Sequence, residues 1–203
     1  MKITDKKNLN LKLIKSFIDY YDYECLSGAD IIYGLHVWPE VKKEAEKAIK
    51  NYFSGIERGM ELEKMISEAQ TPEALVNIMR KPMSMPLRSL LTKKLLEKEE
   101  AVLPLIKEKS LRNFSDYFIE STVEFLICCK TNCSDWIVEN YSSIRCEYMK
   151  ALLCLVLGFR GEVGLIPWLM DETERFGDMD SEDEPERGPA LAVLELYNRF
   201  LKK

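Results

Sequence analysis

The residues best suited to chemistry are the cysteines of the cluster Cys128-Cys129-x-x-x-Cys133. Cysteine thiolates bind zinc and other soft metals, but a zinc site needs four converging ligands, and a Cys-x-x-Cys pair commonly supplies two of them. The chain contains no such pair. Free cysteine also packs in protein interiors as a small hydrophobic residue. The spacing therefore favours reduced, buried thiols, and it leaves open a redox or metal role for this cluster.

Other catalytic signals are sparse. His36 is the only histidine, so the chain has no His-x-x-x-His zinc pair and no choice of base for a catalytic triad. It also has no Gly-x-Gly-x-x-Gly, no Walker phosphate loop, no Gly-x-Ser-x-Gly elbow and no Ser-x-x-Lys. These absences remove the support for most common enzyme classes, and we expect no catalytic residue, cofactor or metal.

Acidic residues are concentrated in one segment. Of the formal net charge of −5, residues 171–186 carry −8, which leaves the rest of the chain at +3. The run from Asp178 resembles a calcium loop only faintly, because an EF-hand needs glycine at the sixth position and glutamate at the twelfth, where this chain has Asp183 and Pro189. We predict a solvated acidic loop over 177–187, with a docking site for a basic partner as the alternative. The loop residues assigned to that contact are Asp178, Asp180, Glu182, Asp183 and Glu184.

Nucleic-acid binding has a weak basis in the composition. The three tryptophans and nine tyrosines could stack on bases, but binding to a phosphate backbone needs a basic stripe, and the isoelectric point is about 5.2. Aromatic residues at helical spacing, such as Trp136 and Tyr141, are more often part of a core. Nucleic acid is therefore not the expected partner.

These residues must be positioned by helices, because apolar residues recur at intervals of three and four along most of the chain. One apolar stripe runs from Ile14 to Tyr21 and another from Val41 to Phe53. Thr71-Pro72-Glu73 is a helix start signal, with a threonine N-cap and a proline in the first turn. The segment 25–39 carries two glycines and Pro39, and we expect a loop with a short helix there.

The second half of the chain is self-similar. Arg88 and Arg145 each open an apolar helix, which is followed by a short turn, at residues 98–100 or 158–161, and a segment that contains Pro104 or Pro167. These two prolines are 63 residues apart, which corresponds to two periods of about 31, the size of a two-helix unit. A degenerate third unit without the proline fits between them at 114–142. A last helix is expected to start at Gly188.

The segment from Ile144-Arg145 to Leu169, with its Ala151-Leu152 pair, Gly158 turn and Leu-Ile-Pro-x-Leu, resembles a HEAT-type repeat of the short kind found in phycobilisome-lyase-like proteins. Residues 87–106 resemble the same repeat without its glycine. This resemblance implies an all-α protein built as an α-solenoid of stacked antiparallel helix hairpins, whose second helices line a concave surface. The alternative is a helical bundle in which the two proline segments match by chance.

We therefore predict a single all-helical domain over residues 1–203. It divides into an irregular helical part (1–81), three HEAT-like hairpins (82–176), the acidic loop (177–187) and a C-terminal capping helix (188–203). The longest apolar run, 151–159, is far shorter than the roughly 20 residues that a membrane span needs. The N-terminus shows no export signal, so we expect a cytoplasmic protein.

The function most consistent with this architecture is a non-enzymatic adaptor or regulatory scaffold that binds another protein on its concave face. Because some HEAT-like proteins are alkylpurine DNA glycosylases, a HEAT-like DNA-binding protein or an enzyme of that kind is the first alternative. A structural subunit of a larger complex is the second. The candidate contact residues on the second helices, expected on their exposed side, are Lys107, Glu108, Glu139, Asn140, Asp171, Glu172 and Arg175.

Overall fold

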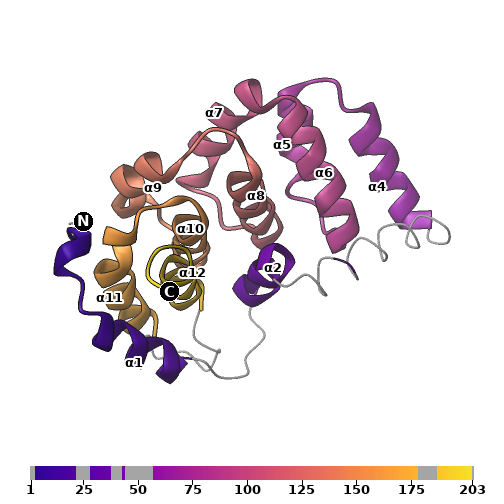
Figure 1. The fold of residues 1–203 in the computed structure, drawn as a ribbon. Coiled ribbons are helices and arrows are strands. Elements are labelled where there is room, and N and C mark those ends of the chain that lie inside the picture. Colours follow the sequence, from indigo (N-terminus) through magenta and orange to yellow (C-terminus); the bar gives the residue numbers. More distant parts are fainter. Residues whose placement is uncertain (1–2, 22–27, 38–42, 44–56, 178–186, 203) are drawn as a thin grey trace.

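The spacing of apolar residues produces helices throughout the part of the chain that the structure describes. The computed structural model describes residues 3–21, 28–37, 43, 57–177 and 187–202, and every regular element within them is helical (Figure 1). The all-α prediction is therefore confirmed for these residues, whereas most of the predicted stripe over 41–53 lies outside them. The α-helices are α1 (Leu11–Tyr21), α2 (Gly28–Val37), α4 (Glu57–Glu68), α5 (Pro72–Ile78), α6 (Met85–Glu97), α7 (Glu99–Ser110), α8 (Asp116–Cys128), α9 (Ser134–Asn140), α10 (Glu147–Arg160), α11 (Ile166–Gly177) and α12 (Gly188–Phe200), with short 3-10 helices η1 (Lys6–Asn8), η2 (Tyr141–Ser143) and η3 (Val163–Leu165).

Local capping signals fix several helix starts. The Thr71 side chain accepts a hydrogen bond of 3.2 Å from the backbone N–H of Ala74, and Pro72 occupies the first turn of α5, where a missing N–H costs nothing. The predicted start at Gly188-Pro189 is also confirmed, because α12 begins at Gly188. Among the described residues, no helix combines the length and the apolar character that a membrane crossing requires.

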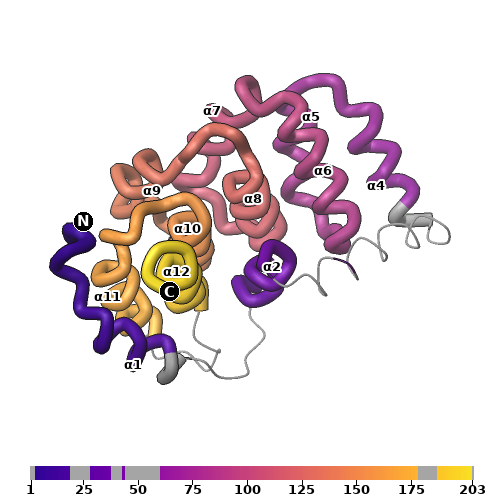
Figure 2. Tube along the Cα trace, viewed as in Figure 1, coloured from indigo at the N-terminus to yellow at the C-terminus, as the bar shows by residue number. Residues whose placement is uncertain are grey.

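The helices lie in two rows that follow an arc (Figures 1 and 2). Along the first row each helix contacts the next, in the order α4, α6, α8, α10 and α12. Helices α5, α7, α9 and α11 form the second row, in which α7 packs on α8, α9 on α10 and α11 on α12. Helix α2 packs against α8, α10 and α12, on the inner side of the arc.

The second helices were expected to line the concave side, but the observed arrangement differs from this expectation. In Figure 1, α7, α9 and α11 lie on the outer side of the arc, and α6, α8 and α10 lie toward α2. The physical reason is the apolar character of the first-row helices. In α10 the residues 151–158 are all buried, and in α8 the residues 121–127 are all buried. A helix that is apolar on every side needs cover on every side, and α2 covers α8 and α10 on their inner side.

Two predicted boundaries are wrong by several residues. The charged turn expected at residues 98–100 is shorter, because α7 already begins at Glu99, so Pro104 lies inside α7. Proline has no N–H to donate to the carbonyl group four residues earlier in the helix. Because Pro104 is exposed, water can pair with that carbonyl instead. The turn expected at 158–161 begins only at Gly161, because Gly158 lies inside α10.

Gly158 belongs to the contact between α10 and α12. A Cβ atom at this position would lie 2.7 Å from the Cα and 3.2 Å from the carbonyl oxygen of Ala192. At the other end of the same contact, a Cβ atom at Gly188 would meet the backbone of Ala151. The two helices can approach this closely only because both positions lack a side chain.

Candidate functional site

Two partly exposed tryptophans lie on neighbouring helices of the outer row. Trp136 lies on α9 and Trp168 on α11. Between them, the Tyr141 ring of η2 meets the Trp168 ring edge to face, with 4.8 Å between the ring centres. The Lys107 ammonium of α7 lies 5.5 Å from the centre of the Trp136 ring. We call these four residues, together with the charged residues of α9 and α11 beside them, the α9–α11 surface.

A charged network borders this surface and holds Tyr141 in place. The Arg175 guanidinium contacts Glu147 and Glu172, each at 2.7 Å, and the Tyr141 hydroxyl donates a hydrogen bond of 2.7 Å to Glu172. Burial raises the pKa of Glu147, but hydrogen bonds from Lys150 and Arg175 outweigh this effect and hold that pKa below its ordinary value. Glu147 therefore stays ionised at neutral pH, and the hydrogen bond to Glu172 orients the Tyr141 ring.

The structure places the sequence-predicted contact residues as follows. Glu172 and Arg175 meet in the charged network, and Lys107 covers Trp136. The Asn140 side chain donates a hydrogen bond of 2.8 Å to the backbone carbonyl of Trp136, so it serves its own helix. The remaining second-helix residues are exposed and form no common cluster: Glu108, Glu139 and Asp171. The acidic-loop residues Asp178, Asp180, Glu182, Asp183 and Glu184 lie outside the described residues.

A buried polar cluster on the inner row escaped the sequence analysis. The Arg88 guanidinium of α6 pairs with the Glu120 carboxylate of α8, which also accepts a hydrogen bond of 3.1 Å from the Tyr148 hydroxyl of α10. Glu124, one turn beyond Glu120, accepts a hydrogen bond of 3.3 Å from Ser89. The signal that could have found it is the pair of glutamates at positions i and i+4 in the otherwise uncharged segment 118–127.

This cluster lies deep in the protein and is closed by α2. Arg88 is 5% exposed and Glu124 is 6% exposed. Gly28, the first residue of α2, has the Tyr148 hydroxyl as its nearest side-chain neighbour, so α2 begins directly over the cluster. The cluster therefore joins α6, α8, α10 and α2.

Glu124 provides a test of the electrostatics of this cluster. Burial raises its pKa to about 7, and the Arg88 charge opposes the rise only in part. The folded protein therefore holds a proton on Glu124 that the unfolded chain releases above its ordinary pKa, and stability falls as the pH rises from about 4.5 to about 7. We expect Glu124→Gln to raise the free energy of unfolding by about 3 kcal/mol at pH 8 and to change it little near pH 4.5.

Urea unfolding of the wild type and the variant at several pH values measures this difference. The matched control is Glu97→Gln, because Glu97 lies on the neighbouring helix α6 with an exposed side chain in an i,i+3 pair with Lys94. We expect that control to change stability by less than about 1 kcal/mol at every pH. The plot of unfolding free energy against pH for Glu124→Gln could instead run parallel to that of the wild type. This result would show that Glu124 is ionised at neutral pH in the folded protein.

The cysteines only partly follow the prediction of buried thiols. Cys129, Cys133, Cys146 and Cys154 are buried and free, as predicted, whereas Cys128 is exposed at the end of α8. The prediction is wrong for Cys128, which lies on the exposed side of the last turn of α8, whereas Phe125, Leu126 and Ile127 of the same turn are buried. Among the described residues, no group of three or more potential metal ligands comes together.

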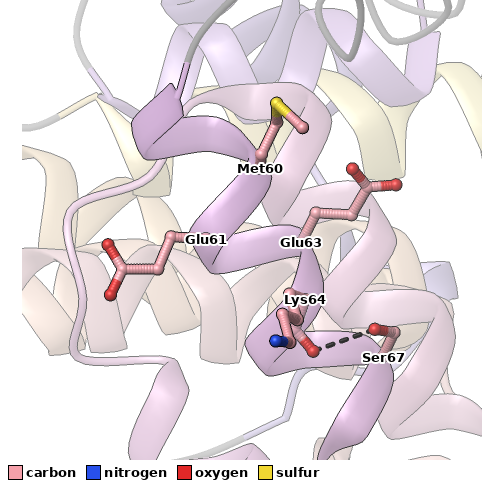
Figure 3. Close-up of a pocket in the computed structure, with 5 residues that line it drawn as sticks. All are labelled: Met60, Glu61, Glu63, Lys64 and Ser67. Carbon is pink, nitrogen blue, oxygen red and sulfur yellow. Dashed lines mark hydrogen bonds between the residues drawn. The ribbon is translucent and has the colours of Figure 1, made fainter.

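Two surface hollows occur elsewhere on the described part of the chain. The described residues that line one of them belong to α4, and their side chains point in different directions along that helix, with Ser67 hydrogen-bonded to the Lys64 carbonyl (Figure 3). The other lies between α1 and α12. It combines three lysines with apolar side chains, and its lining residues are Leu11, Lys12, Lys15, Tyr197, Leu201 and Lys202. In the first hollow the Ser67 hydroxyl donates to a backbone carbonyl and not to a base, and the described lining of the second contains no acidic residue.

Comparison with known proteins adds no assignment. The chain matches no family model, no curated protein and no solved structure. The resemblance to HEAT-type repeats therefore stays a prediction from the sequence, and a function has to be argued from the geometry of the described residues.

Proposed function

We propose that this chain is a non-enzymatic adaptor that binds another protein through the α9–α11 surface. The observation that carries the proposal is the presence of two partly exposed tryptophans, Trp136 and Trp168, beside the Tyr141–Glu172–Arg175 network. Tryptophan, tyrosine and arginine are the residues that most often dominate the binding energy of protein interfaces. Here all three residue types occur on the α9–α11 surface, and hydrogen bonds and ion pairs hold Tyr141 and Arg175 in position.

The charge around this surface indicates the chemistry of the partner. The exposed charged residues of α9 and α11 are all acidic, namely Asp135, Glu139, Asp171 and Glu174. A partner with a basic rim around an apolar or aromatic centre would complement them, and complementary charges increase the rate and the specificity of association. The partner we propose is therefore a protein with a basic surface patch.

We further propose that α6 to α11 form HEAT-like hairpins of an α-solenoid. Support comes from the order of contacts, in which α4, α6, α8, α10 and α12 follow one another in a row and each outer helix packs on the next helix of that row. Stacking of this kind buries a continuous core and leaves long surfaces free for partners. Under this proposal, binding uses the outer row, because α2 occupies the inner side.

The first test measures the partner's affinity for variants of the aromatic centre. We expect Trp168→Ala to weaken binding about 30-fold, because the loss of a central interface tryptophan costs about 2 kcal/mol. The partner is captured from the native cell with the tagged full-length chain, identified by mass spectrometry and then titrated by calorimetry. The matched control is Phe114→Ala, since Phe114 is an aromatic residue 65% exposed just before α8.

Charge reversal gives a second readout that does not disturb packing. We expect Glu139→Lys combined with Asp171→Lys to weaken capture and to reduce its salt dependence, whereas Glu73→Lys on α5 serves as the control. If the reversals leave every captured protein unchanged, the α9–α11 surface is not the binding site.

Retention of the wild type on heparin at low salt, together with salt-dependent binding to duplex DNA, would instead favour the nucleic-acid alternative.

A further inference from the structure

Two buried thiols meet in the loop between α8 and α9. The Cys129 Sγ lies 3.0 Å from the backbone carbonyl oxygen of Thr131, and the Cys133 Sγ lies 3.6 Å from the same oxygen. Cys129 also lies 3.3 Å from the Leu126 carbonyl oxygen, which offers its hydrogen a second acceptor. Both sulfur atoms are thus held around one carbonyl group.

The surrounding helices fix this loop from both sides. The Glu99 carboxylate at the start of α7 accepts hydrogen bonds of 2.8 Å from the backbone N–H groups of Lys130 and Thr131, and one of 2.7 Å from the Thr131 hydroxyl. From α10, Arg160 donates to the Lys130 carbonyl at 3.2 Å, and its own carbonyl accepts from Asn132 at 3.1 Å. This loop geometry holds the two cysteines close together without using either thiol.

The charges around the pair make its two thiols unequal. A hydrogen bond from Cys129 and the nearby charges of Lys107 and Arg160 lower the pKa of the Cys133 thiol, although burial and Glu99 oppose this effect. The hydrogen bond to Cys133, burial and Glu99 raise the pKa of the Cys129 thiol. Cys133 is therefore the nucleophilic thiolate, and Cys129 is the thiol that keeps its proton.

We propose that Cys129 and Cys133 form a peroxide-responsive dithiol that closes to an intrachain disulfide. The Cys133 thiolate attacks hydrogen peroxide and takes up one oxygen to form a sulfenic acid, and the departing hydroxide takes a proton to become water. The Cys129 sulfur then attacks the Cys133 sulfur, and the hydroxyl group leaves with the Cys129 proton as a second water. Two electrons pass from the two sulfur atoms to the peroxide.

Access to the pair requires only a local movement. Both cysteines are 1% exposed, but the three residues between them, Lys130, Thr131 and Asn132, are all exposed. The sulfur atoms are therefore covered by a short surface loop, and reaching them requires the loop to break its hydrogen bonds to Glu99 and Arg160, which is a local opening and not global unfolding. Two other cysteines are not part of this pair. Cys128 is exposed at the end of α8, and the Cys154 Sγ contacts the Tyr141 hydroxyl at 3.6 Å.

The test treats the reduced full-length chain with one equivalent of hydrogen peroxide and identifies the products by intact mass and peptide mapping. We expect the loss of two hydrogen atoms and a peptide cross-link between Cys129 and Cys133. With Cys129→Ser, the Cys133 sulfenic acid should persist and react with dimedone. With Cys133→Ser, the cross-link should be lost, whereas Cys146→Ser should behave like the wild type. A cross-link through Cys128, or oxidation of Cys128 with the pair left reduced, would overturn the proposal.

A second measurement does not depend on disulfide formation. The rate of Cys133 alkylation by iodoacetamide as a function of pH should have its midpoint below the pKa of about 8.5 of free cysteine. Cys129→Ala and Lys107→Met should each move this midpoint upward, and Glu99→Gln should move it downward, because these groups and Arg160 lie close to the thiol. Circular dichroism of each variant verifies that it is folded. A Cys133 midpoint at or above that of free cysteine would contradict the assignment of the nucleophile.

Discussion

Replacement of Arg88 by methionine is expected to lower the free energy of unfolding by about 3 to 5 kcal/mol, which is a large part of the stability of a typical domain. Arg88 is 5% exposed and is paired with Glu120, and its charge also opposes the rise of the pKa of Glu124. Methionine fills a similar volume but removes the ion-pair partner of Glu120. The variant would therefore leave two carboxyl groups in the interior without a cation, and urea unfolding at neutral pH measures the loss.

Two further variants separate this charge effect from a packing effect. Neutralising both carboxylates as well, in Arg88→Met combined with Glu120→Gln and Glu124→Gln, should restore most of the stability, because no charge is then buried without a partner. Lys64→Met is the surface control, since the Lys64–Glu68 pair is largely exposed, and it should cost less than about 1 kcal/mol. If Arg88→Met cost no more than Lys64→Met, the cluster would have no electrostatic role in the stability of the fold.

Replacement of Gly158 by valine is expected to destabilise the protein by about 3 kcal/mol, at the upper end of the usual cost of overpacking a core. The atoms that a new Cβ would meet belong to the backbone of Ala192, at 2.7 Å and 3.2 Å. A backbone cannot move away as a flexible side chain can, so α10 and α12 would have to separate along their contact. Thermal unfolding followed by circular dichroism measures the effect.

The matched control for this prediction is Gly177→Val. Gly177 is the last residue of α11, and a Cβ at that position would have no atom within 4 Å. The same substitution there should leave stability almost unchanged, because it meets no neighbour and lies at a helix end. Equal melting temperatures for the two valine variants would show that the close contact at Gly158 does not constrain the packing of α10 against α12.

The features of the fold that could be predicted from the sequence are those encoded locally. The Thr71-Pro72 start signal and the Gly188-Pro189 start signal lie where helices begin, because caps act through hydrogen bonds only three or four residues away. Helical periodicity predicted the all-α class for the same reason. The predicted turn at 158–161 was wrong about Gly158. Glycine is unfavourable inside a helix, so the sequence suggested a helix end there, but in the structure Gly158 lies inside α10 and allows the close packing of α12.

The candidate sites depended more strongly on distant contacts. The sequence predicted Glu172 and Arg175 as surface residues, but their network includes Tyr141 and Glu147 from other elements. The partnership of Arg88 and Glu120 joins residues on α6 and α8, and no local pattern links them. The sequence predicted buried thiols but gave no sign that Cys129 and Cys133 share one carbonyl oxygen.

The sequence by itself therefore determined that the described chain forms helices, where several of them begin and which of their faces are apolar. Only the tertiary structure decided that α2 covers the inner side of the arc, which places the tryptophans of α9 and α11 on the outer row. The physical reason is the range of the interactions. Helix formation depends on hydrogen bonds and side chains within about four residues, whereas the placement of a helix depends on which distant apolar surface it can bury.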